Sequence, residues 1–560
     1  MDFVLTLHSH LPWMLHHGRW PHGSDWLCEA ALDTYLPLIE ELRRLEADHT
    51  PAPVTLGVTP VLANQLAHPS FQTEMAFFLE ERLSAARRAP ADLAASGDED
   101  LVPIAAYWRT RLERLNDLLA ELGGDLVGEL RRLADAGRLE IISAAATHGY
   151  LPLLGRDESI RLQLLTGRRE HERLFGRPPQ GCWVPECAYR PRGLWQPLPG
   201  ARARERAGVD EHLGATGFGY FFVDAHLAAA GQPLGAYADV PLGAERFDAE
   251  RHDPAGGAPE SNAHTPYRAY QVSRAGDPPV LAFVRDPRSS MQVWSRHQGY
   301  PGDEWYLEFH KIRWPGGLKL WRVTGPDVDL GGKRPYDPAR AVERAETHAG
   351  HFAGLLGAIA TDTRAEGDVV VAPFDTELFG HWWFEGVHFL GEMYRRLAGT
   401  NGPVRPVTAG DHTRAHRRAP RILLAEGSWG ARGDHHMWLN PETEWTWRRL
   451  WALEDAFWDA VPRALGSAWA RPLLAQAARE LLLAQASDWQ FIISTGAAGD
   501  YAIRRFAGHC DDLDALLTGL APSAPEAERD AAARQLPEIA RRDALFPDVL
   551  AAVEAAARSA

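Results

Sequence analysis

Seven short apolar segments, each followed at once by polar side chains, constrain the fold of this chain most. The segments cover residues 3–7, 54–58, 139–145, 181–184, 220–223, 280–284 and 369–374. Such apolar runs, several rich in β-branched residues, predict strands that are buried on both faces. The polar residues that follow them are His8 and His10, Thr59, His148, Glu186, Asp224, Arg285 and Asp375.

The spacing between these segments predicts an α/β fold. Most of the apolar runs alternate with helical patterns or long loops, as parallel strands require. A doubly wound open sheet would place its ligand at one switch point. A closed barrel instead brings the carboxyl ends of all its strands to one end, where catalytic groups meet. The polar residues after every run favour a (β/α)7 barrel, a distorted relative of the eight-stranded one.

Two irregular segments and a change in composition divide the chain. Residues 188–240 contain an Arg/Ala-rich stretch, 201–213, that is expected to be helical, and residues 243–279 are rich in Pro, Gly, Asp and Glu. After about Pro406 the sequence becomes rich in tryptophan and then helical. We therefore expect a barrel over 1–187 and 241–420, an inserted helical and loop subdomain over 188–240, and a C-terminal all-α domain over 421–560 that contributes to the active-site cleft.

The charge balance narrows the class of partner. A formal net charge of −16 argues against nucleic acid and anionic membranes and suits a neutral polymer. No stretch approaches the roughly 20 apolar residues of a membrane span, and the first residues resemble no signal peptide. The four cysteines form neither a disulfide framework nor a zinc-ribbon spacing, so a cytoplasmic protein is expected.

Glu186 and Asp375 are the strongest candidates for chemistry. Each follows a predicted barrel strand, and each lies among aromatic residues, such as Trp183 before Glu186 and Trp382 after Asp375. Retaining cleavage of a glycosidic bond needs a nucleophilic carboxylate and a proton donor about 5–5.5 Å apart, and aromatic rings bind sugar faces. The alternative is two unrelated acids at strand ends, which are common in α/β proteins.

Histidines near the same strand ends leave two chemistries open. His8 and His10 lie on one face of a strand because side chains alternate, and that spacing suits a metal ion. Histidine also hydrogen-bonds sugar hydroxyls, as His148 and His381 are placed to do. Because no closed set of metal ligands is present, we favour sugar binding and expect neither a metal nor another cofactor.

The late tryptophans fall into two groups. Trp447, Trp451 and Trp458 are near helical spacing, which predicts core positions. Trp429 and Trp438 lie in glycine-rich or loop-like sequence, which predicts exposed platforms for sugar rings. Asp488 interrupts an apolar helix, where a buried acid needs a partner, so it is either structural or reaches the end of the barrel.

Five ordered motifs resemble the signature regions of glycoside hydrolase family 57. The third and fourth are closest to those of its 1,4-α-glucan branching enzymes. The motifs are His8-Ser-His-Leu-Pro-Trp13, Ala146-Thr-His-Gly-Tyr150, Trp183-Val-Pro-Glu-Cys-Ala-Tyr189, Asp375-Thr-Glu-Leu-Phe-Gly-His-Trp-Trp383 and Ser487-Asp-Trp489. The resemblance spans nearly the whole chain.

The resemblance implies roles for particular residues. Glu186 would be the nucleophile and Asp375 the general acid and base of a retaining transglycosylase. This enzyme would cut α-1,4-glucan and move the cut chain to a 6-hydroxyl. Implied substrate contacts are His10, His148, Arg285, Gly302, Trp429 and Asp488, and Tyr237 resembles a tyrosine at the tip of a mobile loop.

Other functions remain open from the sequence. An α-amylase-type hydrolase or a 4-α-glucanotransferase of the same family would share every residue named. A metal-dependent α-mannosidase or polysaccharide deacetylase would use His8, His10 and an aspartate instead, and a non-catalytic glucan-binding protein would keep only the barrel. The expected partner is an α-glucan such as amylose or glycogen, bound by a monomer or a weak homo-oligomer.

Overall fold

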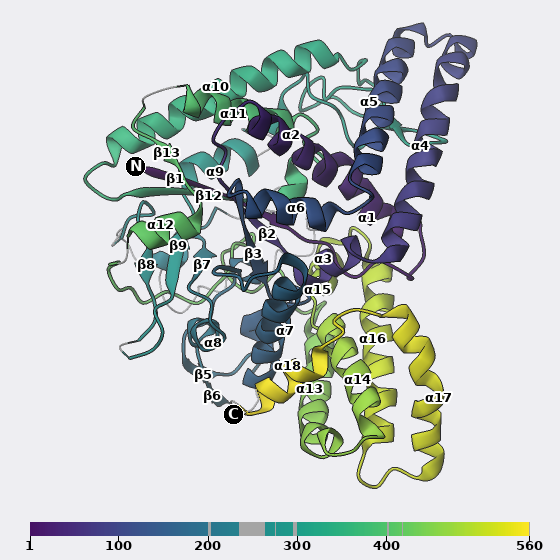
Figure 1. The fold of residues 1–560 in the computed structure, drawn as a ribbon, viewed down its shortest axis with the longest axis vertical. Coiled ribbons are helices and arrows are strands. Elements are labelled where there is room, and N and C mark those ends of the chain that lie inside the picture. Colours follow the sequence, from purple (N-terminus) through teal and green to yellow (C-terminus); the bar gives the residue numbers. More distant parts are fainter. Residues whose placement is uncertain are drawn as a thin grey trace.

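The computed structural model describes residues 1–199, 203–234, 264–274, 276–294, 299–399, 402–416 and 418–558. Figure 1 shows a barrel wrapped by helices and, at lower right, a separate group of helices from the end of the chain. Most of the loop expected over 243–279 lies outside the described residues.

Seven parallel strands build the barrel in the described part of the chain. They are β1 (Asp2–Ser9), β2 (Val54–Val58), β3 (Leu139–Ala144), β4 (Cys182–Trp183), β7 (Tyr220–Val223), β9 (Leu281–Val284) and β12 (Val369–Asp375). Parallel pairing runs in the order β12-β1-β2-β3-β4, and β7 pairs with β9. All but two of the residues in these strands are buried, as the apolar runs predict.

Two backbone contacts close the ring. A parallel bridge between Gly181 and Tyr220 joins the start of β4 to β7. The backbone N–H of Asp286, just after β9, donates to the carbonyl of Val371 in β12 at 2.8 Å. The predicted (β/α)7 barrel is therefore confirmed, and the carboxyl ends of its strands share one end.

Helices cover the outside of the barrel (Figure 1). Short helices follow the strands: α3 (Pro60–Leu66), α8 (Val209–Ala215), α9 (Pro287–Trp294) and α12 (Ala409–Ala415). The helix α1 (Ser24–Ala30) is also short, and the longer ones are α2 (Leu36–Ala47), α4 (Pro69–Ser96), α5 (Val102–Glu121), α6 (Leu126–Asp135), α7 (Asp157–Phe175), α10 (Pro338–Asp362) and α11 (Gly386–Ala398). Gly97, at φ +81°, ends α4 and turns the chain toward α5.

The expected helix over 201–213 is wrong in its first part. Gly193–Trp195 (β5) and Arg204–Arg206 (β6) form an antiparallel hairpin, and the helix α8 begins only at Val209. Tertiary contacts of Arg206 explain the difference, because its guanidinium pairs with Asp157 at 2.6 Å and lies over the Trp195 ring. The barrel strand β7 also lies within residues 188–240, so this range is not only an insertion.

The end of the chain is helical. It contains α13 (Glu444–Leu465), α14 (Ala470–Ala484), α15 (Asp488–Thr495), α16 (Gly499–Leu520), α17 (Glu526–Arg542) and α18 (Val549–Arg558). α18 packs against α7 of the barrel, and an antiparallel bridge joins Gly149 to Ala486. The helical domain thus reaches the loop that follows β3. Among the described helices, none has the length and hydropathy that crossing a bilayer requires.

Candidate active site

Glu186 and Asp375 lie at the same end of the barrel. Glu186 is in the turn Pro185–Cys187 that follows β4, and Asp375 is the last residue of β12, in register with His8 of β1. Both are largely buried, with 7% and 9% of their surface exposed. Glu186 has a positive φ of 61°, a conformation that non-glycine residues adopt mainly where the surrounding structure enforces it.

Both carboxylate oxygens of Glu186 accept hydrogen bonds. The indole Nε1–H of Trp429 donates to Oε2 at 2.8 Å, and the hydroxyl of Ser487 donates to Oε1 at 3.2 Å. The backbone N–H of Trp429 also donates to the Glu186 carbonyl at 3.0 Å. The donors come from segments more than 240 positions along the chain, so the C-terminal domain completes this site.

Burial has the largest effect on the pKa of Glu186. Removal from water raises its pKa to about 8, and the negative charges of Asp375 and Asp488 add to the rise. The hydrogen bonds from Trp429 and Ser487 oppose it. His8, in register with Asp375, stacks its ring on that of Trp183 in β4 at 4.6 Å, which brings the ends of the two acid-bearing strands together.

Three histidines form a stack beside the acids. His148, at φ +59°, has its Nε2 3.0 Å from Nε2 of His8 and its Nδ1 2.8 Å from the hydroxyl of Ser487. The His10 ring lies 4.0 Å from that of His148, nearly parallel to it. Burial, followed by the charge of His10, lowers the pKa of both His8 and His148 far below the usual value, so both rings are neutral.

Asp488 finds its partner on the barrel. It begins α15, and its carboxylate lies 2.9 Å from Nε2 of His10. The other ring nitrogen of His10 lies 3.1 Å from the Thr59 hydroxyl at the end of β2. The interrupted apolar helix therefore places its acid at the end of the barrel, which was one of the two possibilities that the sequence left open.

Arg285 follows β9 and is almost fully buried. Its Nε–H donates to the hydroxyl of Ser290 at 3.0 Å, and Nη1 lies 3.9 Å from Asp224, which follows β7. The guanidinium also lies 5.6 Å from the centre of the Trp429 ring. Burial alone would raise the pKa of Asp224, but a hydrogen bond from His226 and the charge of Arg285 lower it below its usual value.

The prediction that Trp429 and Trp438 are exposed platforms is wrong. Their exposed fractions are 1% and 0%. Trp429 packs edge-on against Trp183, with ring centres 5.1 Å apart, and Trp438 stacks on Tyr150 at 4.5 Å. The glycine-rich sequence does form a loop, but the two tryptophan rings point inward and pack against other aromatic rings. The expected core positions of Trp447 and Trp458 are confirmed, and Trp451 is partly buried.

For three further residues predicted to bind substrate, no described contact places them beside Glu186 and Asp375. The ring of His381 is oriented toward Asp33, with Nδ1 and the carboxylate 3.8 Å apart. Gly302 ends the turn Tyr300–Gly302, which contacts α9. Tyr237 lies outside the described residues. Their roles in substrate binding stay predictions.

The sequence reasoning did not select two residues that contact the predicted ones. Glu377 is buried two positions after Asp375, and its Oε1 accepts hydrogen bonds from the Tyr35 hydroxyl and from the backbone N–H of His10. Burial, reinforced by the charge of Asp375, raises the pKa of Glu377 to about 8. Ser487 bridges Glu186 and His148. Its position in the Ser487-Asp-Trp489 motif was the only available signal.

One group at this end of the barrel has the composition of a metal site. Ligand atoms of His10, His148 and Asp488 lie within 4.8 Å of one another. These side chains already pair with protein groups, His10 with Asp488 and Thr59, and His148 with His8 and Ser487. Hydrogen bonds within the protein therefore account for their positions.

Comparison with known proteins identifies the family. The model of glycosyl hydrolase family 57 matches residues 4–422, and that of the C-terminal region of 1,4-alpha-glucan branching enzymes matches residues 452–553. The chain belongs to glycosyl hydrolase family 57. The family expected from the five motifs is thereby confirmed.

Similar members of family 57 are branching enzymes by name. A 1,4-alpha-glucan branching enzyme of Thermococcus kodakarensis is 40% identical over 98% of this chain and 77% of its own length. A probable 1,4-alpha-glucan branching enzyme of Mycobacterium tuberculosis is 31% identical over 97% of this chain and 96% of its own.

Solved structures agree over the whole chain. The crystal structure of the Thermococcus enzyme, in complex with glucose and additives, has a TM-score of 0.88 at 38% identity, covering 99% of this chain and 96% of its own. The alpha-amylase AmyC of Thermotoga maritima has a TM-score of 0.78 at 27% identity, covering 98% and 99%.

Proposed function

We propose that this chain is a 1,4-α-glucan branching enzyme that works by retaining transglycosylation. The observation that carries the proposal is the pair of buried acids, Glu186 just after β4 and Asp375 at the end of β12, at one end of the barrel. Two carboxyls at one site are the requirement of retaining glycoside chemistry. The named relatives, similar over almost the entire chain, direct this chemistry toward α-glucan branching.

In this proposal Glu186 is the nucleophile. An ionised carboxylate has no proton to donate and can only accept hydrogen bonds. Both oxygens of Glu186 face donors, Trp429 and Ser487. The neighbouring side chains can form a chain of hydrogen bonds in which every donor points toward Glu186. Neutral His8 donates to His148, His148 donates to Ser487, and Ser487 donates to Glu186. The raised pKa of Glu186 would suit a proton donor, but this set of donors favours the anion.

Asp375 then serves as the general acid and base. It protonates the departing glucan oxygen while Glu186 forms a covalent bond to the anomeric carbon. In the second half it removes a proton from a 6-hydroxyl of another glucan, which gives an α-1,6 branch, or from water, which gives hydrolysis. Branching therefore requires that water be kept from the covalent intermediate.

The second candidate is an α-amylase-type hydrolase. It is favoured by the likeness to AmyC, which is named an alpha-amylase and shares the same architecture. Both activities use the same two acids and differ in the acceptor. The likeness to a 4-alpha-glucanotransferase of Thermococcus litoralis, at 14% identity, concerns the fold alone.

Linkage analysis of amylose after incubation with the protein separates the two candidates. The proposal predicts new α-1,6 linkages in excess of new reducing ends, whereas an excess of reducing ends would favour the hydrolase. Glu186→Gln and Asp375→Asn should each abolish both products. Glu454→Gln is the matched control, because Glu454 is also a buried carboxyl held by two donors, Gly155 and Gln485, and it should retain activity.

Several finer features belong to this proposal. The expected domain boundaries at residues 187, 240 and 420, a cytoplasmic location and a monomeric or weakly self-associating state stay predictions. All four cysteines are buried and free, which is consistent with the cytoplasmic expectation. Light scattering during size-exclusion chromatography would measure the oligomeric state, and a stable dimer at micromolar concentration would contradict that part.

A further inference from the structure

A second cluster of histidine and aspartate lies at the opposite end of the barrel. Asp2 is the first residue of β1, and Asp368 immediately precedes β12. His412 lies in α12, and His416 follows that helix. Figure 1 shows α12 beside the N-terminal start of β1. His8 lies six positions after Asp2 along β1, so the cluster lies about 20 Å from the acid pair.

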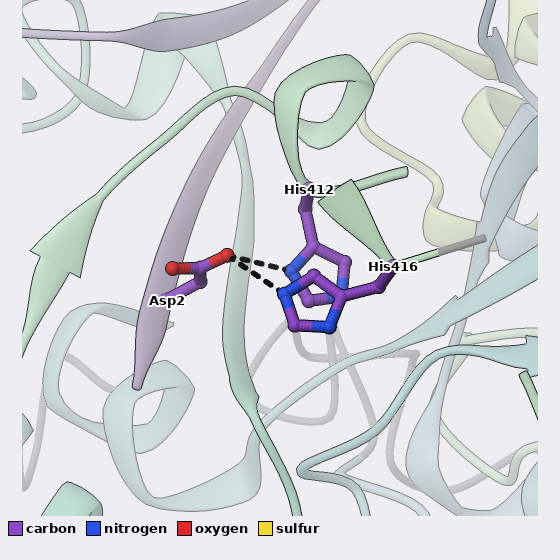
Figure 2. Close-up of side chains that lie close together, drawn as sticks. All are labelled: Asp2, His412 and His416. Carbon is purple, nitrogen blue, oxygen red and sulfur yellow. Dashed lines mark hydrogen bonds and ion pairs between the residues drawn. The ribbon is translucent and has the colours of Figure 1, made fainter. Parts of the chain in front are cut away.

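The ligand atoms of this cluster converge (Figure 2). Oδ2 of Asp2 is 2.8 Å from Nδ1 of His412 and 3.6 Å from Nε2 of His416. One atom from each of the three residues lies within 4.8 Å of the other two. Ligands at about 2.0–2.1 Å from a tetrahedral zinc ion are about 3.3 Å apart, which falls between the distances from Asp2 to the two histidines.

Each imidazole is bracketed by two carboxylates. His416 has Nδ1 3.1 Å from Asp368 and Nε2 3.6 Å from Asp2. His412 has Nδ1 2.8 Å from Asp2 and Nε2 3.8 Å from Asp368. A neutral imidazole carries one proton, so one nitrogen of each ring presents a lone pair to an anionic oxygen. Such a contact is repulsive unless a cation lies between the two atoms.

Protonation of the two histidines is an unfavourable way to satisfy these contacts. The two rings are stacked, with centres 4.2 Å apart and an interplanar angle of 16°. Protonating both rings would place two positive charges face to face at that distance. A single divalent ion avoids this, because it satisfies one lone pair from each ring together with Asp2, while both rings stay neutral.

The surrounding residues orient the ligands. Arg405 donates to Oδ1 of Asp2 at 2.9 Å and 2.7 Å, which leaves Oδ2 for the cluster. Oδ2 of Asp368 lies 3.1 Å from Nδ1 of His416, and a proton on that nitrogen would leave the lone pair of Nε2 directed at Asp2. Oδ1 of Asp368 is buried and has no hydrogen-bond partner among the described residues. Carboxylates that fix the tautomer of a histidine ligand are a regular feature of zinc sites.

We propose that Nδ1 of His412, Nε2 of His416 and Oδ2 of Asp2 bind a zinc ion, with Asp368 as the positioning residue for His416. Nitrogen and carboxylate ligands suit Zn²⁺ rather than Mg²⁺ or Ca²⁺, which take oxygen ligands. His412 and Asp2 are buried, whereas His416 is partly exposed and gives the ion a route of entry. The ion would link the start of β1 to α12 and stabilise the barrel at the end remote from glucan chemistry.

Zinc titration of the chelator-treated full-length chain tests the proposal. A chromophoric zinc indicator in competition should report one tight site per chain. His416→Ala should weaken that site at least tenfold, because it removes one of three protein ligands at a partly exposed position where folding is tolerant. Asp368→Asn should weaken it by about 10–100-fold. Zinc at 100 times its dissociation constant should raise the melting temperature of the unaltered chain by about 2 °C.

His10→Gln is the matched control, because His10 belongs to the other histidine and aspartate group near the acids. The proposal requires that this variant keep the tight site and its thermal shift. It is overturned if His416→Ala binds zinc as tightly as the unaltered chain, or if His10→Gln is the variant that loses the site. Zinc-edge anomalous diffraction should place the ion between Asp2, His412 and His416, and a peak elsewhere would equally refute it.

Discussion

Replacing Trp429 by phenylalanine removes the indole hydrogen bond to Glu186 and keeps an aromatic ring at the position. The indole Nε1–H donates to Oε2 of Glu186 at 2.8 Å, and the ring is fully buried against Trp183. Phenylalanine keeps an aromatic ring at this position but cannot donate. The variant therefore isolates the contribution of this donor to the ionised form of Glu186.

The size of the effect follows from the type of bond. A hydrogen bond to a charged group contributes about 1.5–3 kcal/mol, and one pKa unit corresponds to about 1.4 kcal/mol. The pKa of Glu186, already raised to about 8 by burial, should rise by about one to two further units. If Glu186 must be ionised to attack, kcat/KM at pH 7 falls about 10–100-fold.

The assay is the pH dependence of kcat/KM on amylose, since this quantity reports ionisations of the free enzyme. The acid limb should move to higher pH by one to two units in Trp429→Phe. Trp438→Phe is the matched control. Trp438 is equally buried, and its Nε1 has no hydrogen-bond partner within the described part of the chain. Its acid limb should stay where it is in the unaltered protein.

Two results would refute this reasoning. An unmoved acid limb in Trp429→Phe would mean that the indole does not stabilise the charge on which the rate depends. Equal shifts in both variants would assign the effect to lost packing volume rather than to the hydrogen bond.

The other predictions concern neighbouring groups. Ser487→Ala removes the weaker donor to Glu186, at 3.2 Å, and should move the acid limb by less than one pH unit in the same assay. A larger shift than that of Trp429→Phe would contradict this ranking of the two donors. Burial raises the folded-state pKa of Glu377 to about 8, from 4.5, so the folded chain holds a proton that the unfolded chain releases. Stability should therefore fall as pH rises from about 4.5 to 8, and thermal unfolding of Glu377→Gln should show a smaller fall. The amide oxygen can still accept from Tyr35 and His10, and a slope unchanged by this substitution would refute the assignment.

The barrel could be predicted from sequence because its strands are buried on both faces. Even β4, only two residues long, was found, because the apolar run 181–184 leads directly to Glu186. The hairpin of β5 and β6 was missed because its Arg/Ala-rich sequence suits a helix. Its extended form depends on tertiary contacts of Arg206, with Asp157 and with the Trp195 ring.

Site residues that directly follow a barrel strand could be predicted from the sequence. Contacts between segments far apart in the sequence could not. Glu186, Asp375, His10 and His148 follow strands of a closed barrel, so their convergence follows from topology. The burial of Trp429 and Trp438 depends on how a loop packs under its neighbours, which local glycine content does not reveal. Ser487 contacts Glu186 across 301 positions of sequence, and no local pattern encodes such a contact.

Trapping the covalent intermediate tests the central claim most directly. A fluorinated α-glucosyl fluoride that forms the glycosyl-enzyme rapidly and loses it slowly would be followed by peptide mapping with mass spectrometry. The account predicts one label per chain, as an ester on Glu186, and no label in Glu186→Gln. A label on Asp375 would exchange the two roles, and a label on neither acid, with turnover intact, would contradict the proposed chemistry.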